Sequence, residues 1–296
     1  MNDLPSVIKH SKICLYADDV KLYKSICSVQ DINDLQSDIN NFSAWCNSWS
    51  LKINLKKCAV IDFGPSLSYP LPCHYVLEGN TIINSDSYKD LGILVSSNLN
   101  FSNHLYRVIN TAHSRANFIL RAFPYSNSST RCKLFCSYVR PLLEYCSQIW
   151  SPNTLENIDL IEGVQRSFTR RLPGISSLSY TDRLNKTNLP SLEIRRLRAD
   201  LTLLYNILHN NLYISRNMFV LRSNMVSSSV NTRGHSLRLF ISHVNSNVVK
   251  YAFFHRTAML WNTLDDYVIS APNCKIFNER LLDSHLVPFL RGRALM

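Results

Sequence analysis

Residues 12–24 of this 296-residue chain read KICLYADDVKLYK, and no other segment is as informative. Two short apolar runs, Ile13–Tyr16 and Val20–Tyr23, flank a compact turn that carries Asp18 and Asp19. Side chains that alternate on both sides of a short polar turn are typical of a β-hairpin. The sequence therefore predicts a hairpin with two adjacent carboxylates at its tip.

The rest of the chain predicts a small α+β front followed by an all-helical back. A start like a capping box at residues 28–31 precedes apolar steps of three and four up to Trp49, which predicts an amphipathic helix. Strands are expected at residues 51–55 with 59–63 as their partner, in a hairpin around 78–80, and at 88–95. Helical spacing then marks residues 101–123, 134–145 with a break at Pro141, 158–172, 194–208 and 248–264.

The charge is distributed unevenly between these two regions. Residues 1–100 carry 8 Lys and 10 acidic residues, a net charge of −2, whereas residues 101–296 carry 24 Lys and Arg against 11 acidic residues, a net charge of +13. A basic back region indicates a polyanionic partner such as a nucleic acid. The alternative is that a basic surface reports solubility alone.

Composition also indicates the cellular compartment and excludes glycine-rich phosphate-binding loops. No apolar run approaches the ~18–20 residues of a membrane span, and the N-terminus has no apolar core of a signal peptide. Nine irregularly spaced cysteines favour a reduced protein. We therefore expect an intracellular protein, nuclear or cytoplasmic, that is not secreted. Glycine-rich phosphate loops of the GxGxxG or GxxxxGK[ST] type are absent from the sequence.

The chemistry that suits Asp18 and Asp19 is cation binding. Two neighbouring carboxylates repel each other unless a cation lies between them, and oxygen ligands with open positions suit Mg²⁺. In two-metal phosphoryl transfer, such ions hold the attacking and leaving oxygens. The alternative is a purely structural role, because aspartate is common in turns, where its side chain hydrogen-bonds the backbone.

Tyr16-Ala17-Asp18-Asp19 resembles the YADD box of reverse transcriptases of non-LTR (LINE-type) retrotransposons. Further segments resemble that family in the same order along nearly the whole chain: Asn2–Pro5 before the box, Leu22-Tyr23 after it, the helix with Trp45 and Trp49, Asn54–Cys58 as an N-x-x-K-[TC] motif, Tyr88–Gly92 as a Y-x-x-L-G motif, Arg140–Tyr145 with Trp150, and Leu260–Leu264. The ordered set is much more specific than any one motif.

The resemblance implies template-directed DNA synthesis. In the complete enzyme Asp18 and Asp19 would bind two Mg²⁺ ions at the primer end, and Lys57 would lie near the incoming dNTP and could protonate the departing pyrophosphate. Tyr16 would pack by the nucleotide or primer, and Leu91 with Gly92 would grip the primer. The alternatives are a solvated surface lysine at position 57 and a buried core aromatic at position 16.

The resemblance also implies an architecture: a partial palm at residues 1–97, a thumb-like helical region at 98–210 and a C-terminal helical region at 211–296. The family places a third carboxylate and a G-x-x-Q-G-type motif before the segment that Asn2–Pro5 resembles, and neither is present here. We therefore expect this chain alone to be inactive. The competing hypotheses are a non-catalytic basic nucleic-acid-binding protein derived from a decayed element, and an unstable product with exposed sheet edges.

The expected nucleic-acid partner is an RNA template paired with a DNA primer, held by its phosphates and not by its sequence. Arginine suits phosphate contacts, and the candidates are Arg166, Arg170, Arg171, Arg195, Arg196 and Arg198. The alternative is a solvated helix face with local ion pairs. A zinc site at Cys132, Cys136 and Cys146 with His104 or His113 is disfavoured by its spacing.

Overall fold

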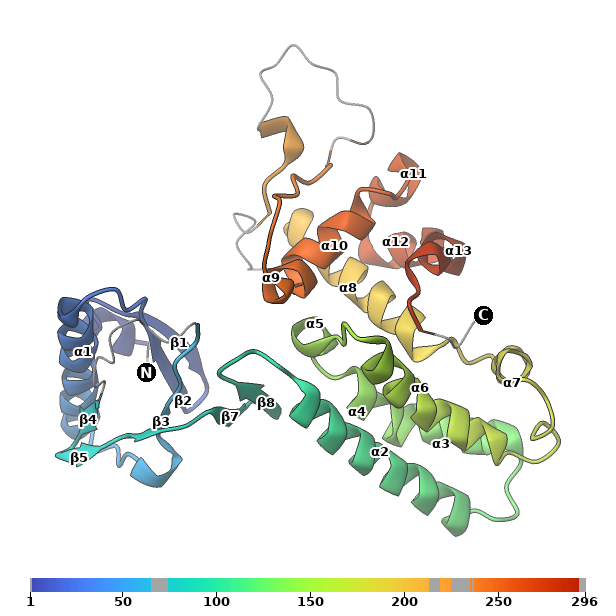
Figure 1. Cartoon of the computed structure of the whole chain (residues 1–296), viewed down its shortest axis with the longest axis horizontal. Coiled ribbons are helices and arrows are strands. Elements are labelled where there is room, and N and C mark those ends of the chain that lie inside the picture. The colour runs from blue at the N-terminus through green and yellow to red at the C-terminus, as the bar shows by residue number, and fades with distance from the viewer. Residues whose placement is uncertain (1, 65–73, 213–218, 225–234, 236, 293–296) are drawn as a thin grey trace. The chain divides into compact units, whose positions relative to one another are not determined.

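The structure, a computed structural model, describes residues 2–64, 74–212, 219–224, 235 and 237–292 (Figure 1). The chain divides into two compact units, Met1–Asn100 and Phe101–Met296. Unit 1 combines one long helix with short strands, and the described elements of unit 2 are helices. The predicted α+β fold class is confirmed.

Unit 1 contains four two-stranded sheets among its described residues. Strands β1 and β2 pair antiparallel, as do β4 with β5 and β7 with β8, whereas β3 and β6 pair parallel. The elements in chain order are η1 (Leu4–Val7), β1 (Lys12–Tyr16), β2 (Asp19–Tyr23), α1 (Val29–Ser48), η2 (Leu55–Lys57), β3 (Ala59–Val60), β4 (Val76–Leu77), β5 (Asn80–Thr81), β6 (Ile83–Asn84), β7 (Ser87–Asp90) and β8 (Ile93–Ser96).

The predicted hairpin and helix of unit 1 are confirmed, and two strand predictions are wrong. Residues 51–54 form no strand, and β3 pairs instead with β6, more than twenty residues further on. Residues 88–95 form a hairpin and not one strand, because Leu91 and Gly92 both have positive φ (43° and 91°). Positive φ at both central residues is the type I′ pattern that joins antiparallel strands.

Helix α1 organises unit 1 through two apolar clusters. The first joins Leu4 to Trp45 and Cys46, and the second joins Ile39 to Tyr75 and Leu77. From the hairpin, Ile13 and Val20 pack against the first cluster and Leu22 against the second. These three residues lie on one face of β1–β2, because side chains alternate along a strand. The opposite face carries Cys14, Tyr16, Asp19 and Lys21.

Unit 2 consists of α2 (Ser102–Ala122), α3 (Ser128–Tyr138), α4 (Arg140–Glu144), α5 (Ser147–Trp150), α6 (Leu155–Arg170), α7 (Tyr180–Thr187), α8 (Leu192–Leu208), η4 (Arg222–Asn224), α9 (Asn247–Tyr251), α10 (Phe253–Trp261), α11 (Asp266–Ile269), α12 (Cys274–Arg280), α13 (Asp283–Leu286) and η5 (Val287–Phe289). Helix α8 shares one core with the C-terminal helices, in which Leu201 and Leu204 lie with Trp261 and Phe277. The boundary expected near residue 210 therefore falls within a common core. No described helix is long and apolar enough to cross a membrane.

The structure divides two of the helical stretches predicted for unit 2, and only the first of these breaks was predicted. Residues 134–145 divide into α3 and α4, with the break just before Pro141 as expected from its missing N–H. The single helix expected at residues 248–264 is two helices, α9 and α10. Ala252 separates them with an extended conformation, φ −61° and ψ 152°. The predicted helices at residues 101–123, 158–172 and 194–208 are confirmed as α2, α6 and α8.

Candidate metal and nucleic-acid sites

The turn between β1 and β2 presents both aspartates to solvent. Tyr16 pairs with Asp19, so Ala17 and Asp18 are the two turn residues, and Ala17 has a positive φ of 53°. The side chains of Asp18 and Asp19 are exposed and have no hydrogen bond or ion pair with any described residue. Tyr16 is 65% exposed, so it is not a core aromatic of this unit.

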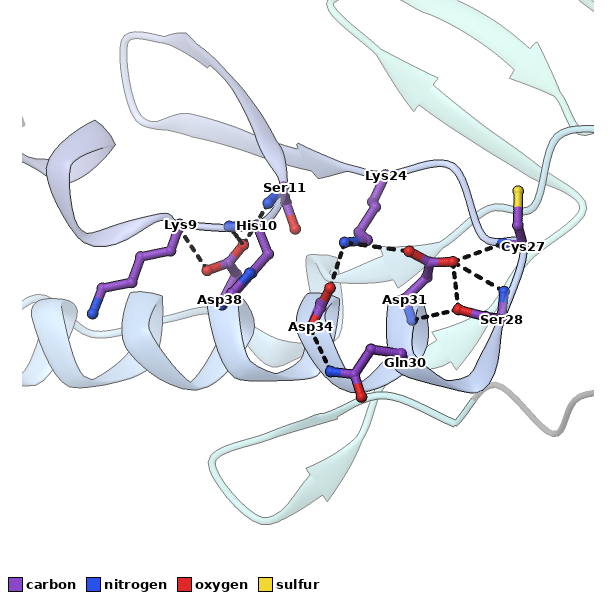
Figure 2. Close-up of polar contacts among 10 residues, drawn as sticks. All are labelled: Lys9, His10, Ser11, Lys24, Cys27, Ser28, Gln30, Asp31, Asp34 and Asp38. Carbon is purple, nitrogen blue, oxygen red and sulfur yellow. Dashed lines mark hydrogen bonds and ion pairs between the residues drawn. The ribbon is translucent and has the colours of Figure 1, made fainter.

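The start of the hairpin is anchored to α1 by a buried carboxylate, Asp38 (Figure 2). Its two oxygens accept hydrogen bonds from the backbone N–H groups of Lys9, His10 and Ser11 at 2.8, 2.8 and 2.6 Å. Burial by itself raises the pKa of Asp38, but these donors outweigh burial and the net pKa is lowered. The charged carboxylate therefore fixes the segment that leads into β1.

The end of the hairpin is anchored to the same helix by Lys24. Its ammonium lies 2.7 Å from Asp34 and 3.4 Å from Asp31 (Figure 2). Asp31 also closes the capping box of α1 with Ser28. The hydrogen bond to Asp34 raises the pKa of Lys24. Both ends of the hairpin are thus tied to one helix, and this makes the turn a fixed platform.

Asp38 was not found from the sequence, although a signal was present. It lies three residues after Leu35 and next to Ile39, on the apolar face of the helix. A carboxylate in such a position is buried and therefore needs partners. The segment Asn2–Pro5 has a structural role of the same kind, because Asp3 accepts hydrogen bonds from the indole N–H groups of Trp45 and Trp49 at 2.9 and 3.2 Å.

The β7–β8 hairpin connects the other predicted site residues of unit 1. The Tyr88 hydroxyl donates to the backbone carbonyl of Lys57 at 2.9 Å, and the ammonium of Lys21 lies 2.6 Å from Asp90. The side chain of Lys57 is exposed. Leu91 and Gly92, the two turn residues, are also exposed. Three motifs that are far apart in sequence are therefore joined by specific contacts.

The donor set at the turn fits a divalent cation in part. Carboxylate oxygens are the ligands that Mg²⁺ prefers, and Asp18 and Asp19 are adjacent, accessible and unpaired. Among the described residues no three His, Cys, Asp or Glu side chains gather closely enough to hold a metal ion. The turn therefore carries two exposed carboxylates, and the described residues add no third one beside them. The cysteines considered for zinc do not form such a group either.

Three of the six candidate arginines are either paired or buried within unit 2. Arg195 binds both carboxylate oxygens of Glu144, and Arg198 donates to the Asn278 carbonyl at 2.9 Å and to Asp283 at 2.7 Å. Arg196 is buried, with the carboxylates of Glu162 and Glu193 among its charged neighbours. In this conformation the Arg196 guanidinium has no surface on which to meet a phosphate.

The other three arginines lie on α6 or directly after it, and each is at least partly exposed. Arg170 is exposed and its side chain has no hydrogen bond or ion pair with any described residue, and Arg171 is exposed while donating to Asn117 on α2 at 2.6 Å. Arg166 is half-buried, 3.8 Å from Asp159, with its guanidinium 5.3 Å from the centre of the Tyr180 ring. Burial and pairing thus separate a possible contact surface from structural arginines that the sequence pattern grouped together.

Comparison with known proteins relates the chain to RNA-directed DNA polymerases. It is 28% identical over 167 residues to the RNA-directed DNA polymerase from mobile element jockey of Drosophila funebris and 29% identical over 169 residues to that of Drosophila melanogaster. Each match covers 55% of this chain and 18% of the polymerase. The predicted relationship to reverse transcriptases of this kind is supported, and the chain spans less than a fifth of the length of these relatives.

A third match is to a protein whose name states no activity. The chain is 36% identical over 122 residues to an uncharacterized protein of Caenorhabditis elegans, and that match covers 40% of this chain and 62% of the nematode protein. No family model matches the chain. No solved structure matches it either.

Proposed function

We propose that the chain is part of an RNA-directed DNA polymerase of a non-LTR retrotransposon. In this proposal unit 1 contributes Asp18 and Asp19 as Mg²⁺ ligands, and unit 2 holds the backbone of the RNA template and DNA primer. The observation that carries the proposal is the pair of exposed, unpartnered carboxylates on a turn anchored at both ends. The similarity to the jockey polymerases supports it.

Each residue of the site has a separate task in this proposal. Asp18 and Asp19 place negative charge at the turn, where bound Mg²⁺ would stabilise the charge that develops on the transferred phosphoryl group. The exposed ammonium of Lys57 is available to neutralise and protonate the leaving pyrophosphate. Tyr16 packs beside the nucleotide or primer, and the Leu91–Gly92 turn contacts the primer.

The chain alone is expected to give no polymerase activity. Two-metal transfer needs more ligands than two carboxylates, and the described residues bring no third carboxylate to the turn. A primer-extension assay with the 296-residue chain, an RNA template, a DNA primer and Mg²⁺ should yield no product. Extension that disappears in Asp18→Ala would contradict this expectation.

Metal binding provides the direct test of the proposed site. Tyr16 stands directly opposite Asp19 across the strand pair, so a Tb³⁺ ion bound at the turn would receive excitation energy from a nearby tyrosine. We expect tyrosine-sensitised Tb³⁺ emission that Mg²⁺ displaces and that Asp18→Asn with Asp19→Asn abolishes. The matched control is Asp62→Asn, an exposed aspartate elsewhere in unit 1. Tb³⁺ emission that is unchanged in the variant with Asp18→Asn and Asp19→Asn would contradict the proposed metal site.

The competing function, a non-catalytic nucleic-acid-binding protein, predicts a different result. Binding to an RNA–DNA duplex would then survive Asp18→Ala with Asp19→Ala and would be independent of Mg²⁺. Under the polymerase proposal the duplex also binds unit 2 in a salt-dependent way, but the metal at the turn contributes in addition. Fluorescence anisotropy with and without Mg²⁺ on both variants separates the two functions.

A further inference from the structure

Lys21 is positioned to compete with a metal ion for Asp19. The two residues alternate along β2, so their side chains lie on the same face of the hairpin, roughly 7 Å apart along the strand. A lysine side chain is a flexible four-carbon stem that ends in a compact charge. If unrestrained, the Lys21 ammonium can reach the Asp19 carboxylate and occupy the place of a cation.

In the structure this ammonium is held elsewhere. It lies 2.6 Å from one carboxylate oxygen of Asp90 and donates to the other at 2.7 Å. Asp90 is the last residue of β7, directly before the Leu91–Gly92 turn. The Tyr88 hydroxyl bond to the Lys57 carbonyl holds the same strand. The acceptor for Lys21 is therefore part of a structured hairpin, 69 residues further along the chain.

We propose that Asp90 holds the Lys21 ammonium away from Asp18 and Asp19, and thereby leaves both carboxylates free to bind a divalent cation. The proposal rests on the metal site proposed above. It assigns Asp90 as a positioning residue that acts through Lys21 and does not itself touch the metal. Partly exposed ion pairs of this kind contribute little to stability, which is consistent with a role in arranging charge.

The first test requires no metal. A water-soluble carbodiimide joins carboxylates to amines that are already in contact, and mass spectrometry of the digested protein locates the new amide. In the wild-type chain we expect a Lys21–Asp90 link. In Asp90→Asn we expect the link to move to Asp19 or Asp18, as an internal loss of water within one peptide. A Lys21 that forms no link to either aspartate in Asp90→Asn would overturn the proposal.

The second test measures the consequence for cation affinity by Tb³⁺ emission. Asp90→Asn should weaken Tb³⁺ binding about threefold to tenfold, because one positive charge moves to within several ångströms of the site. Lys21→Gln should bind at least as tightly as the wild type, and Lys21→Gln with Asp90→Asn should restore wild-type affinity. If the Lys21–Asp90 ion pair only stabilises the fold, Lys21→Gln and Asp90→Asn should weaken Tb³⁺ binding equally, and that result would overturn the proposal.

Controls separate this inference from the site on which it rests. Asp86→Asn changes an exposed carboxylate just before β7 and should alter neither the cross-links nor the Tb³⁺ affinity. If the wild type shows no Tb³⁺ emission at all, the proposed metal site fails. The cross-link result still stands on its own, because it reports whether Asp90 holds Lys21 in the absence of any metal.

Discussion

The two units use charged side chains in opposite ways. In unit 1 the carboxylates of Asp31, Asp34 and Asp38 bind nearby N–H, hydroxyl or ammonium donors, and Asp18 and Asp19 remain unpaired on the surface. In unit 2 the carboxylates of Glu162 and Asp200 are buried between helices. The Tyr180 hydroxyl and the Leu192 N–H donate to Glu162, and Arg256 donates to Asp200 at 2.9 and 3.1 Å.

The difference appears in the direction of the pKa shifts. Hydrogen bonds from Ser28 and Lys24 lower the pKa of Asp31 and Asp34, respectively. Burial raises the pKa of Glu162 and of Asp200, and the favourable neighbours of each only reduce that shift. Unit 1 therefore uses charge to hold a surface hairpin, whereas unit 2 places charge inside its helix interfaces. The unpaired carboxylates of Asp18 and Asp19 lie on the turn of the hairpin that unit 1 holds in this way.

The largest expected effect is on the buried pair of unit 2. Arg256→Gln removes the positive charge that Asp200 faces and leaves this buried carboxylate without its ionic partner, and breaking a buried ion pair in this way costs about 3–5 kcal/mol. Urea denaturation of the full chain, followed by helix content, should show this loss in unit 2. Glu279→Gln, an exposed change on α12, is the control and should lie within about 0.5 kcal/mol of the wild type. A small effect of Arg256→Gln would contradict the comparison.

A smaller effect is expected at the anchor of unit 1. Asp38→Asn reduces the acceptors available to the N–H groups of Lys9, His10 and Ser11, and the loss of a charged hydrogen-bond acceptor costs about 1.5–3 kcal/mol. Amide hydrogen exchange should show faster exchange in residues 9–16 with little change in unit 2. Asp62→Asn provides the matched control. Uniform acceleration over both units would show that Asp38 does not act locally.

The arginines sharpen the comparison within unit 2. Arg170→Gln with Arg171→Gln should weaken RNA–DNA duplex binding and reduce the slope of log K against log salt by about 1.4–1.8, since each phosphate contact contributes about 0.7–0.9. Arg198→Gln should leave the slope unchanged, because its guanidinium is held by Asn278 and Asp283. If the Arg170, Arg171 variant keeps the wild-type salt slope, as Arg198→Gln is expected to, neither Arg170 nor Arg171 contacts phosphate.

The smallest expected effect is a difference in pH response. Asp31, Asp34 and Asp38 have lower pKa values in the folded chain than the unfolded value near 3.8. These carboxylates therefore stabilise the fold above pH 3.8, and this contribution is lost as the pH falls through their folded pKa values. Glu162 and Asp200 have higher pKa values in the folded chain than in the unfolded chain. Their contribution to stability is therefore present below their unfolded pKa values and is lost as the pH rises through their folded pKa values.

Acidification from pH 6 to 2.5 should therefore destabilise unit 1 relative to unit 2. Hydrogen exchange corrected for its intrinsic pH dependence measures both units in one sample. Asp38→Asn should reduce the acid sensitivity of unit 1 because one of the responsible carboxylates is gone. Equal responses of the two units would contradict the contrast in their carboxylates.

Sequence reasoning succeeded where short-range patterns determine structure. Alternation fixed the hairpin around Asp18, and three- and four-residue spacing fixed α1, α2, α6 and α8. It failed where a positive φ or a distant partner decided the outcome. A single strand was predicted over the hairpin that turns at Leu91 and Gly92, and β3 pairs with β6 and not with its sequence neighbour.

The amino-acid sequence alone determined helices α1, α2, α6 and α8, the acidic turn and the ordered motifs that relate the chain to reverse transcriptases, because each depends on residues close together in the chain. The tertiary structure alone decided which charged groups are available. Asp18 is exposed while Asp38 is buried, and Arg170 is exposed while Arg196 is buried. Burial and pairing depend on contacts such as Lys21 with Asp90, and folding brings these partners together across long stretches of sequence.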